Sequence, residues 1–132
     1  MLTICEGSRV NFSDVTAWFV QMREEHKIDA FKVGYDRALA GYWVEEMKSN
    51  GFTMEPVAQG AFTWSQPMRE MGAALTDKIV NYNNNPILLW CLSNTAVKKS
   101  GLNNIQPVKI TDKRRIDGAV SLLNAWVIYV KY

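Results

Sequence analysis

Cysteine and histidine are scarce in this sequence, which has two Cys and one His among its 132 residues. Cys5 and Cys91 belong to no Cys-x-x-Cys pair, and no Cys/His cluster surrounds His26. The residues therefore indicate neither a structural zinc site nor a disulfide framework. Two free thiols are typical of proteins in a reducing compartment, so we expect a cytoplasmic protein.

Long apolar runs and phosphate-binding loops are missing as well. No stretch reaches the roughly 18 apolar residues of a membrane span, and the N-terminus lacks the basic and apolar pattern of a secretory signal. A Gly-x-x-x-x-Gly-Lys-Ser/Thr loop, which would bind nucleotide phosphates, is absent too. These absences argue against a membrane protein, a secreted protein and an ATPase domain.

The composition is that of an ordinary folded protein. Hydrophobic residues make up 48% and charged residues 21% of the chain, and 132 residues suit a single domain with a sizeable core. The formal net charge is only +2, so attraction to nucleic acid depends on where the charges lie. Positions 98–115 contain six basic residues and one acid. Charge alone leaves open whether this segment is a solvated hairpin or one that faces DNA.

Hydrophobic periodicity predicts alternating strands and helices, followed by a hairpin and a closing helix. We expect strands at residues 1–5, 28–35 and 52–58 and helices at residues 12–26, 37–50 and 65–79. Residues 87–92 could form a buried strand or a helical turn, and we favour a helix because Asn85 as cap and Pro86 at the first position form a helix start. The hairpin pairs residues 95–99 with residues 105–110, and Thr111 or Asp112 caps the last helix. This order indicates an α/β fold in which helices flank the sheet.

Two acidic residues lie at positions that suit chemistry. Asp36 closes the second predicted strand, at the edge of an α/β sheet where ligands collect. Asp117 follows the basic cluster Lys113–Arg115 at the start of the last helix. A carboxylate beside a basic patch suits metal-dependent chemistry on a phosphodiester. Each acid also has a structural interpretation, as a helix N-cap or as a partner of the helix dipole.

The last helix also has a narrow polar stripe. Asp117, Ser121 and Asn124 are spaced i, i+4 and i+7, so they share one face of an otherwise apolar helix. A buried polar group without a partner costs about 1–3 kcal/mol. The stripe therefore predicts metal coordination or hydrogen bonds to a facing strand.

Short motifs in a fixed order cover nearly all of the chain. The first are Tyr35-Asp36-Arg37, Asn50-Gly51, Val57-Ala58-Gln59-Gly60 and Ser65-Gln66-Pro67. The later ones are Asn85-Pro86, Leu89-Trp90, Ser93-Asn94, Lys98 with a Gly-Asn-containing turn, Pro107-Val108-Lys109 and residues 115–122. In this order they resemble the C-terminal nuclease domain of the large subunit of tailed-bacteriophage terminases, the motors that package and cut viral DNA.

The resemblance implies an RNase H-like fold, with a mixed sheet flanked by helices, in which acidic residues hold two divalent ions, Mg2+ or Mn2+. By position, Asp36 and Asp117 match two of the family's catalytic, metal-binding acids. The phosphates of double-stranded DNA would be contacted, without sequence readout, by Lys98, Lys99, Lys109, Lys113, Arg114 and Arg115. The whole protein would be a metal-dependent endonuclease that cleaves concatemeric viral DNA. It would act with the portal and the small terminase subunit in a bacterial cell, encoded by a phage or prophage.

The family pattern also has members that this sequence lacks. A further acid belongs to a strand upstream of Met1, and the ATPase domain lies before that. A histidine often precedes the Asn-Pro motif, where this chain has Tyr82 and Asn83. We therefore expect the C-terminal part of the nuclease domain, as an excised piece or a short reading frame of a prophage remnant. Two acids without the third predict weak metal binding and little or no cleavage, and an uncovered sheet edge predicts a homo-oligomer.

Two other functions remain open. A non-catalytic prophage remnant would bind DNA or a packaging partner through the basic hairpin, with a salt-dependent DNA affinity indifferent to Asp36 and Asp117. A small α/β domain that binds a nucleotide or metabolite is the third, although no glycine-rich loop follows a strand.

Overall fold

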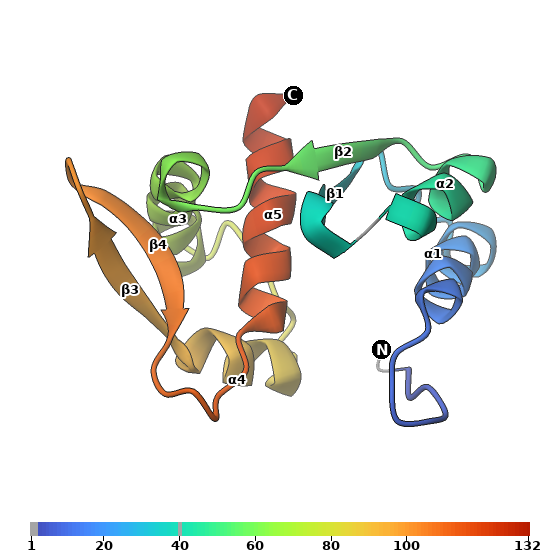
Figure 1. Ribbon diagram of the computed structural model, residues 1–132, viewed down its shortest axis with the longest axis horizontal. Coiled ribbons are helices and arrows are strands. Elements are labelled where there is room, and N and C mark those ends of the chain that lie inside the picture. Colours follow the sequence, from blue (N-terminus) through green and yellow to red (C-terminus); the bar gives the residue numbers. More distant parts are fainter. Residues whose placement is uncertain (1–2, 40) are drawn as a thin grey trace. The chain divides into compact units, whose positions relative to one another are not determined.

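The computed structural model describes residues 3–39 and 41–132, with the side chain of residue 39 excepted. The chain forms two compact units, residues 1–56 and 57–132, and each is described by itself. Both combine helices with short strands, so the predicted α/β class is confirmed (Figure 1). The strands form two-stranded sheets, β1 with β2 and β3 with β4. Among the described residues, no helix has the length and apolar character needed to cross a membrane.

In the first unit, helix α1 (Phe12–His26) packs against helix α2 (Gly41–Ser49). Strand β1 (Val33–Asp36) leads through a 3-10 turn (Arg37–Leu39) into α2. Strand β2 (Met54–Val57) pairs with β1 and carries the chain into the second unit. The core of this unit consists of Val33, Met47 and Phe52, with half-buried apolar side chains of α1 and α2 around them.

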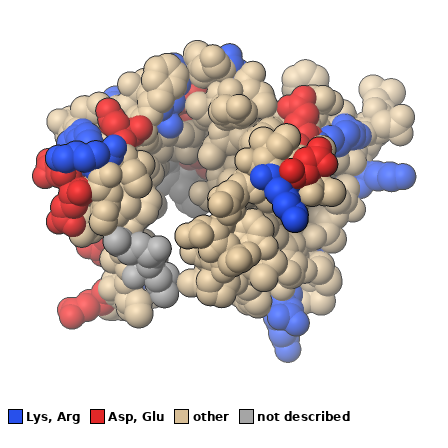
Figure 2. Space-filling model, turned by 180° about the vertical axis from the view of Figure 1, so that it is seen from behind, with Lys and Arg blue, Asp and Glu red and all other residues tan. Residues whose placement is uncertain are grey.

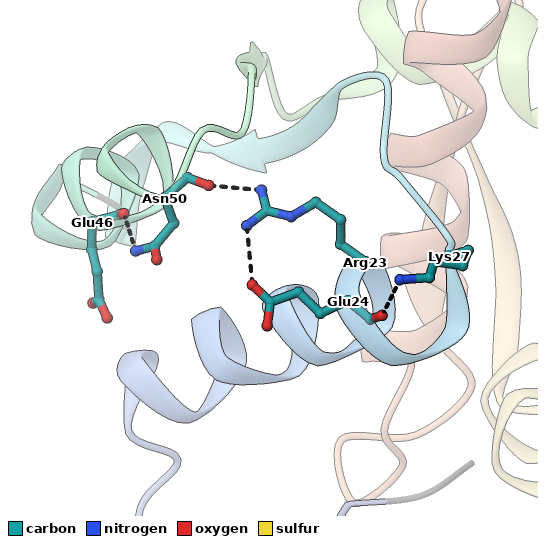
Figure 3. Close-up of polar contacts among 5 residues, drawn as sticks. All are labelled: Arg23, Glu24, Lys27, Glu46 and Asn50. Atoms are coloured by element: carbon teal, nitrogen blue, oxygen red, sulfur yellow. Dashed lines mark hydrogen bonds and ion pairs between the residues drawn. The ribbon is translucent and has the colours of Figure 1, made fainter.

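Arg23 joins the ends of the two helices of the first unit (Figure 3). Its Nη1 donates a hydrogen bond of 2.8 Å to the Asn50 carbonyl oxygen, and its guanidinium lies 4.7 Å from the centroid of the Phe52 ring. Gly51 follows with φ 88°, a conformation that favours glycine. The motif Asn50-Gly51 therefore ends α2 and presents a carbonyl to α1, which is a structural role.

In the second unit, helix α3 (Ala61–Thr76) lies between the hairpin and helix α5 (Asp117–Lys131) (Figure 1). The hairpin pairs strand β3 (Thr95–Ser100) with strand β4 (Asn104–Lys109) in antiparallel register. Helix α4 (Pro86–Ser93) packs against α5. Buried Trp64, Met71 and Leu123 form the core where α3 meets α5.

The elements at residues 12–26, 87–92 and the hairpin are confirmed. The helix predicted at residues 37–50 corresponds to the 3-10 turn Arg37–Leu39 and α2, and four other predictions differ from the structure. Residues 3–5, the described part of the first predicted strand, lie outside any strand, and Met1 and Leu2 lie outside the described residues. Strand β1 begins at Val33, whose amide donates to the Thr53 carbonyl oxygen at 2.8 Å, whereas the Ile28 amide donates to the Met22 carbonyl oxygen at the end of α1.

Two helices begin elsewhere than predicted, both in the second unit. Helix α3 begins at Ala61, before Ser65: the Trp64 amide donates to the Gly60 carbonyl oxygen at 3.0 Å, and Trp64 joins the core with Leu123. Helix α5 begins at Asp117, after Thr111 and Asp112. Tertiary hydrogen bonds of Asn94 with Ile110 and Arg115 hold the residues before Asp117 out of the helix.

Candidate functional site

Asp117 is the first residue of α5, and its side chain is exposed. The residue before it, Ile116, occupies the N-cap position with its side chain 9% exposed, so it cannot cap the helix with a polar atom. No residue in the described ranges donates a hydrogen bond to the Asp117 carboxylate. The carboxylate is therefore available to a ligand.

The segment before Asp117 is fixed by one buried asparagine at the C-cap of α4. The Asn94 side chain is 5% exposed, and its Nδ2 donates a hydrogen bond of 3.0 Å to the Arg115 carbonyl oxygen. The Asn94 carbonyl oxygen accepts a hydrogen bond of 2.9 Å from the Ile110 amide. Both ends of residues 110–115 are thus held by the same residue.

The residue after Asp117 packs closely on α4. A Cβ atom at Gly118 would lie 3.1 Å from Cys91 Sγ and 3.3 Å from Cys91 Cβ. Cys91 is 4% exposed, so it has little room to move aside. Glycine at 118 lets the first turn of α5 approach α4. Asp117 therefore lies between Gly118, which packs on Cys91, and the segment that Asn94 holds.

Asp36 is the last residue of β1 and is half-buried. Its Oδ1 accepts a hydrogen bond of 2.9 Å from the Ala38 amide, so the carboxylate caps the 3-10 turn that follows. This hydrogen bond is the cap that the structural interpretation of Asp36 predicts. A carboxylate has about four lone-pair positions, so one cap hydrogen bond leaves others for an ion.

The two acids belong to different units, Asp36 to residues 1–56 and Asp117 to residues 57–132. Within the described residues, no three His, Cys, Asp or Glu side chains gather as a metal site. Carboxylate oxygens are nevertheless the donors that hard divalent cations prefer, and Mg2+ usually keeps several waters beside one or two carboxylates. Asp36 and Asp117 each offer, within their own unit, the type of donor that such an ion takes.

The polar stripe of α5 is divided between surface and core. Asp117 and Ser121 are exposed, whereas Asn124 is 9% exposed. Asn124 Oδ1 accepts hydrogen bonds from Trp64 Nε1 at 3.2 Å and from Gln59 Nε2 at 3.5 Å. Asn124 therefore has a structural role in the core. Its partners are side chains of α3 and of the loop before α3, and not of a facing strand.

The basic residues of the hairpin do not share one face. In the β3–β4 register, Lys99 pairs with Ile105 and Lys109 pairs with Thr95, whereas Lys98 pairs with Gln106. Because neighbouring residues of a strand point to opposite faces, Lys99 and Lys109 lie on one face and Lys98 lies on the other. All three are exposed.

Lys113, Arg114 and Arg115 are exposed in the segment that leads into α5. The Arg114 amide donates to the Thr111 carbonyl oxygen at 3.0 Å, which closes a turn. This segment directly precedes Asp117 in the chain, so a cationic cluster adjoins the acid. On the face that Figure 2 shows, Lys and Arg side chains lie in several separate groups, some of them beside Asp and Glu side chains.

Ser65 docks the hairpin onto α3, a role that the sequence motif alone did not reveal. Its buried hydroxyl oxygen lies 3.1 Å from the Ile105 amide and 2.7 Å from Arg69 Nη1, and both donate to it. Arg69 Nη2 also donates to the Asn103 carbonyl oxygen in the hairpin turn. Ser65 and Asn94 both lie in family-like motifs, but only the folded structure shows their partners.

Comparison with known proteins identifies the family. Residues 3–131 match the family described as the terminase large subunit, endonuclease domain. Protein YmfN of Escherichia coli strain K12 is 35% identical over 71 residues, which cover 52% of this chain and 16% of that protein.

Two solved structures have a similar fold. The HK97 bacteriophage large terminase gives a TM-score of 0.79 at 20% identity over 92% of this chain and 26% of that one. The large terminase nuclease of thermophilic phage G20c gives a TM-score of 0.71 at 18% identity, over 96% of this chain and 65% of that one. This chain thus spans less than two thirds of each relative, and its fold is the RNase H-like fold of terminase nucleases. With the family match covering nearly every residue, the chain belongs to the endonuclease domains of terminase large subunits.

Proposed function

We propose that this chain is part of a metal-dependent endonuclease that cuts concatemeric viral DNA during packaging. The chain would provide two of its acids, Asp36 and Asp117. The observation that carries the proposal is the exposed Asp117 carboxylate, held at the start of α5 by buried contacts on both sides, in a chain of this family. The longer protein would act in a phage-infected or lysogenic bacterial cell with the portal and the small terminase subunit.

Asp36 and Asp117 would hold Mg2+ or Mn2+, because both offer carboxylate oxygens with free lone pairs. When bound, such ions supply Lewis acids for phosphodiester hydrolysis. Two protein carboxylates make a weak site for a pair of ions, so we expect affinities that require millimolar metal. Lys113, Arg114 and Arg115 would hold the DNA backbone beside Asp117 through charge alone.

Plasmid cleavage tests the proposal. Supercoiled plasmid incubated with the purified chain and manganese should be nicked slowly, or not measurably, below millimolar Mn2+. Any nicking should be lost in Asp117→Asn and in Asp36→Asn. Asp112→Asn is the matched control, since Asp112 is an exposed acid in the same basic segment, and it should keep wild-type activity.

Three outcomes would count against parts of the proposal. Brisk cleavage at micromolar Mn2+ would show that the two acids suffice and that the expected weakness is wrong. Nicking that survives both acid substitutions would remove Asp36 and Asp117 from the chemistry. A chain that neither binds Mn2+ nor nicks DNA would not be part of a nuclease site.

The second candidate is a non-catalytic remnant that binds DNA through its basic hairpin. It is favoured by the exposed Lys98, Lys99 and Lys109, and by the absence of a three-acid cluster in the part of the chain that the structure describes. DNA affinity that falls with salt and is unchanged by metal, Asp36→Asn or Asp117→Asn would support this candidate over the nuclease.

A further inference from the structure

We propose that Asn94 is a positioning residue for Asp117, acting through the backbone of residues 110–116. The inference rests on the proposed metal-binding function of Asp117. Asn94 touches neither the acid nor a substrate in the described structure, so its effect must pass through the segment that it holds.

The geometry shows how one side chain can set the entry into α5. Asn94 uses its backbone carbonyl to hold the Ile110 amide at 2.9 Å and its side-chain amide to hold the Arg115 carbonyl at 3.0 Å. These two hydrogen bonds close the basic segment into a loop with a fixed end. Asp117 lies two residues beyond that end.

Ordinary helix capping does not explain an asparagine at this position. Asparagine is favoured at helix C-termini where the backbone is left-handed, but Asn94 has φ −88° and ψ −5°. Its backbone conformation is open to most residues. The part-buried hydrogen bond to Arg115 is what requires a short side chain with an amide donor, since the Asn94 side chain is buried and a buried polar group is costly to leave unpaired.

Helix α4 fixes the other side of Asp117 as well. Cys91 lies three residues before Asn94 on α4, and its Sγ sits against Gly118. With Ile116 buried, the backbone is held before and after the acid while the carboxylate itself remains exposed. Such supporting contacts orient metal ligands, and losing one typically lowers metal affinity about 10–100-fold.

Manganese titration followed by NMR tests this role in the intact chain. Bound Mn2+ broadens amide signals near it, so the Mn2+ concentration that half-broadens the Asp117 and Gly118 signals reports affinity. We expect Asn94→Ala to raise this concentration about tenfold. This is the lower end of the range of about 10–100-fold, because Asn94 acts on Asp117 through the backbone and does not touch its carboxylate.

The control is Asn124→Ala, which removes another buried asparagine of the same unit, seven residues from Asp117 along α5. It should lower the melting temperature as Asn94→Ala does, yet leave the Mn2+ midpoint unchanged. Should Asn94→Ala fail to fold, Asn94→Ser shortens the side chain while keeping a polar group, and the same rise is expected.

The results separate this inference from the proposed function. If wild-type Asp117 signals do not broaden with Mn2+, the proposed metal site itself is wrong. If they broaden in the wild type and at the same midpoint in Asn94→Ala, the nuclease proposal stands and the positioning role is overturned. Equal shifts in Asn94→Ala and Asn124→Ala would reduce the effect to general loss of stability and also overturn it.

Discussion

Replacing Gly118 by alanine tests how tightly the first turn of α5 packs against α4. The added Cβ would lie 3.1 Å from Cys91 Sγ, 3.3 Å from Cys91 Cβ and 3.5 Å from Leu88 Cδ1. The first two distances are shorter than ordinary contacts, so Cys91 or the first turn of α5 must give way by a few tenths of an ångström. Because Asp117 is the neighbouring residue, a shift here moves the acid.

The magnitude follows from two opposing terms. Overpacking a buried contact by one methyl group costs about 1–3 kcal/mol. Alanine gains at most about 1 kcal/mol over glycine in a helix, and less near its start, where few backbone hydrogen bonds depend on it. We therefore expect Gly118→Ala to destabilise the second unit by about 1–2 kcal/mol. For a unit of this size each kcal/mol lowers the melting temperature by about 4–8 °C.

A double-mutant cycle measured by thermal and urea unfolding assigns the cost to this contact. Cys91→Ala removes Sγ, so the double variant Gly118→Ala/Cys91→Ala should recover part of the loss, with a coupling of at least about 0.5 kcal/mol. Recovery stays partial because the Cβ contact remains. A Gly118→Ala chain as stable as the wild type, or a cycle with no coupling, would refute the close approach of α5 to α4.

Three further changes have defined outcomes. Asn124→Ala leaves Trp64 Nε1 without its acceptor and should cost about 1–3 kcal/mol in urea unfolding; no loss would mean that water replaces the acceptor. Asn85→Ala removes the acceptor for two amides at the start of α4, each 3.0 Å away. It should lower the free energy of unfolding by about 1 kcal/mol in the same assay, and a loss below about 0.5 kcal/mol would contradict the cap. Alanine at all of residues 113–115 should weaken DNA binding in fluorescence anisotropy and reduce the slope of log affinity against log salt by about 2–3; an unchanged slope would place the DNA elsewhere.

Local signals in the sequence predicted the elements that depend on neighbouring residues. The start of α4 at Asn85-Pro86 is one, because the cap and the proline both act within three residues. The hairpin is another. The start of α5 was predicted too early because the decisive hydrogen bond, from Asn94 to Arg115, joins residues far apart in the sequence.

The site was predicted only in part for the same reason. Asp36 and Asp117 stand out through their place in the order of motifs, and the structure puts them at a strand end and a helix start. Their roles as metal ligands stay predictions. The supports of Asp117, which are Asn94 and the contact of Cys91 with Gly118, arise from the packing of α4 on α5 and have no signature in local periodicity.

Mn2+ binding to the wild-type chain, compared with Asp36→Asn and Asp117→Asn, shows whether these two acids bind the metal. We predict weak binding that broadens the NMR signals of residues near Asp36 and near Asp117, and a large loss of broadening around the replaced acid while the fold is unchanged. Broadening that is scattered over other exposed acids, or that persists in both variants, would contradict a metal site built on Asp36 and Asp117.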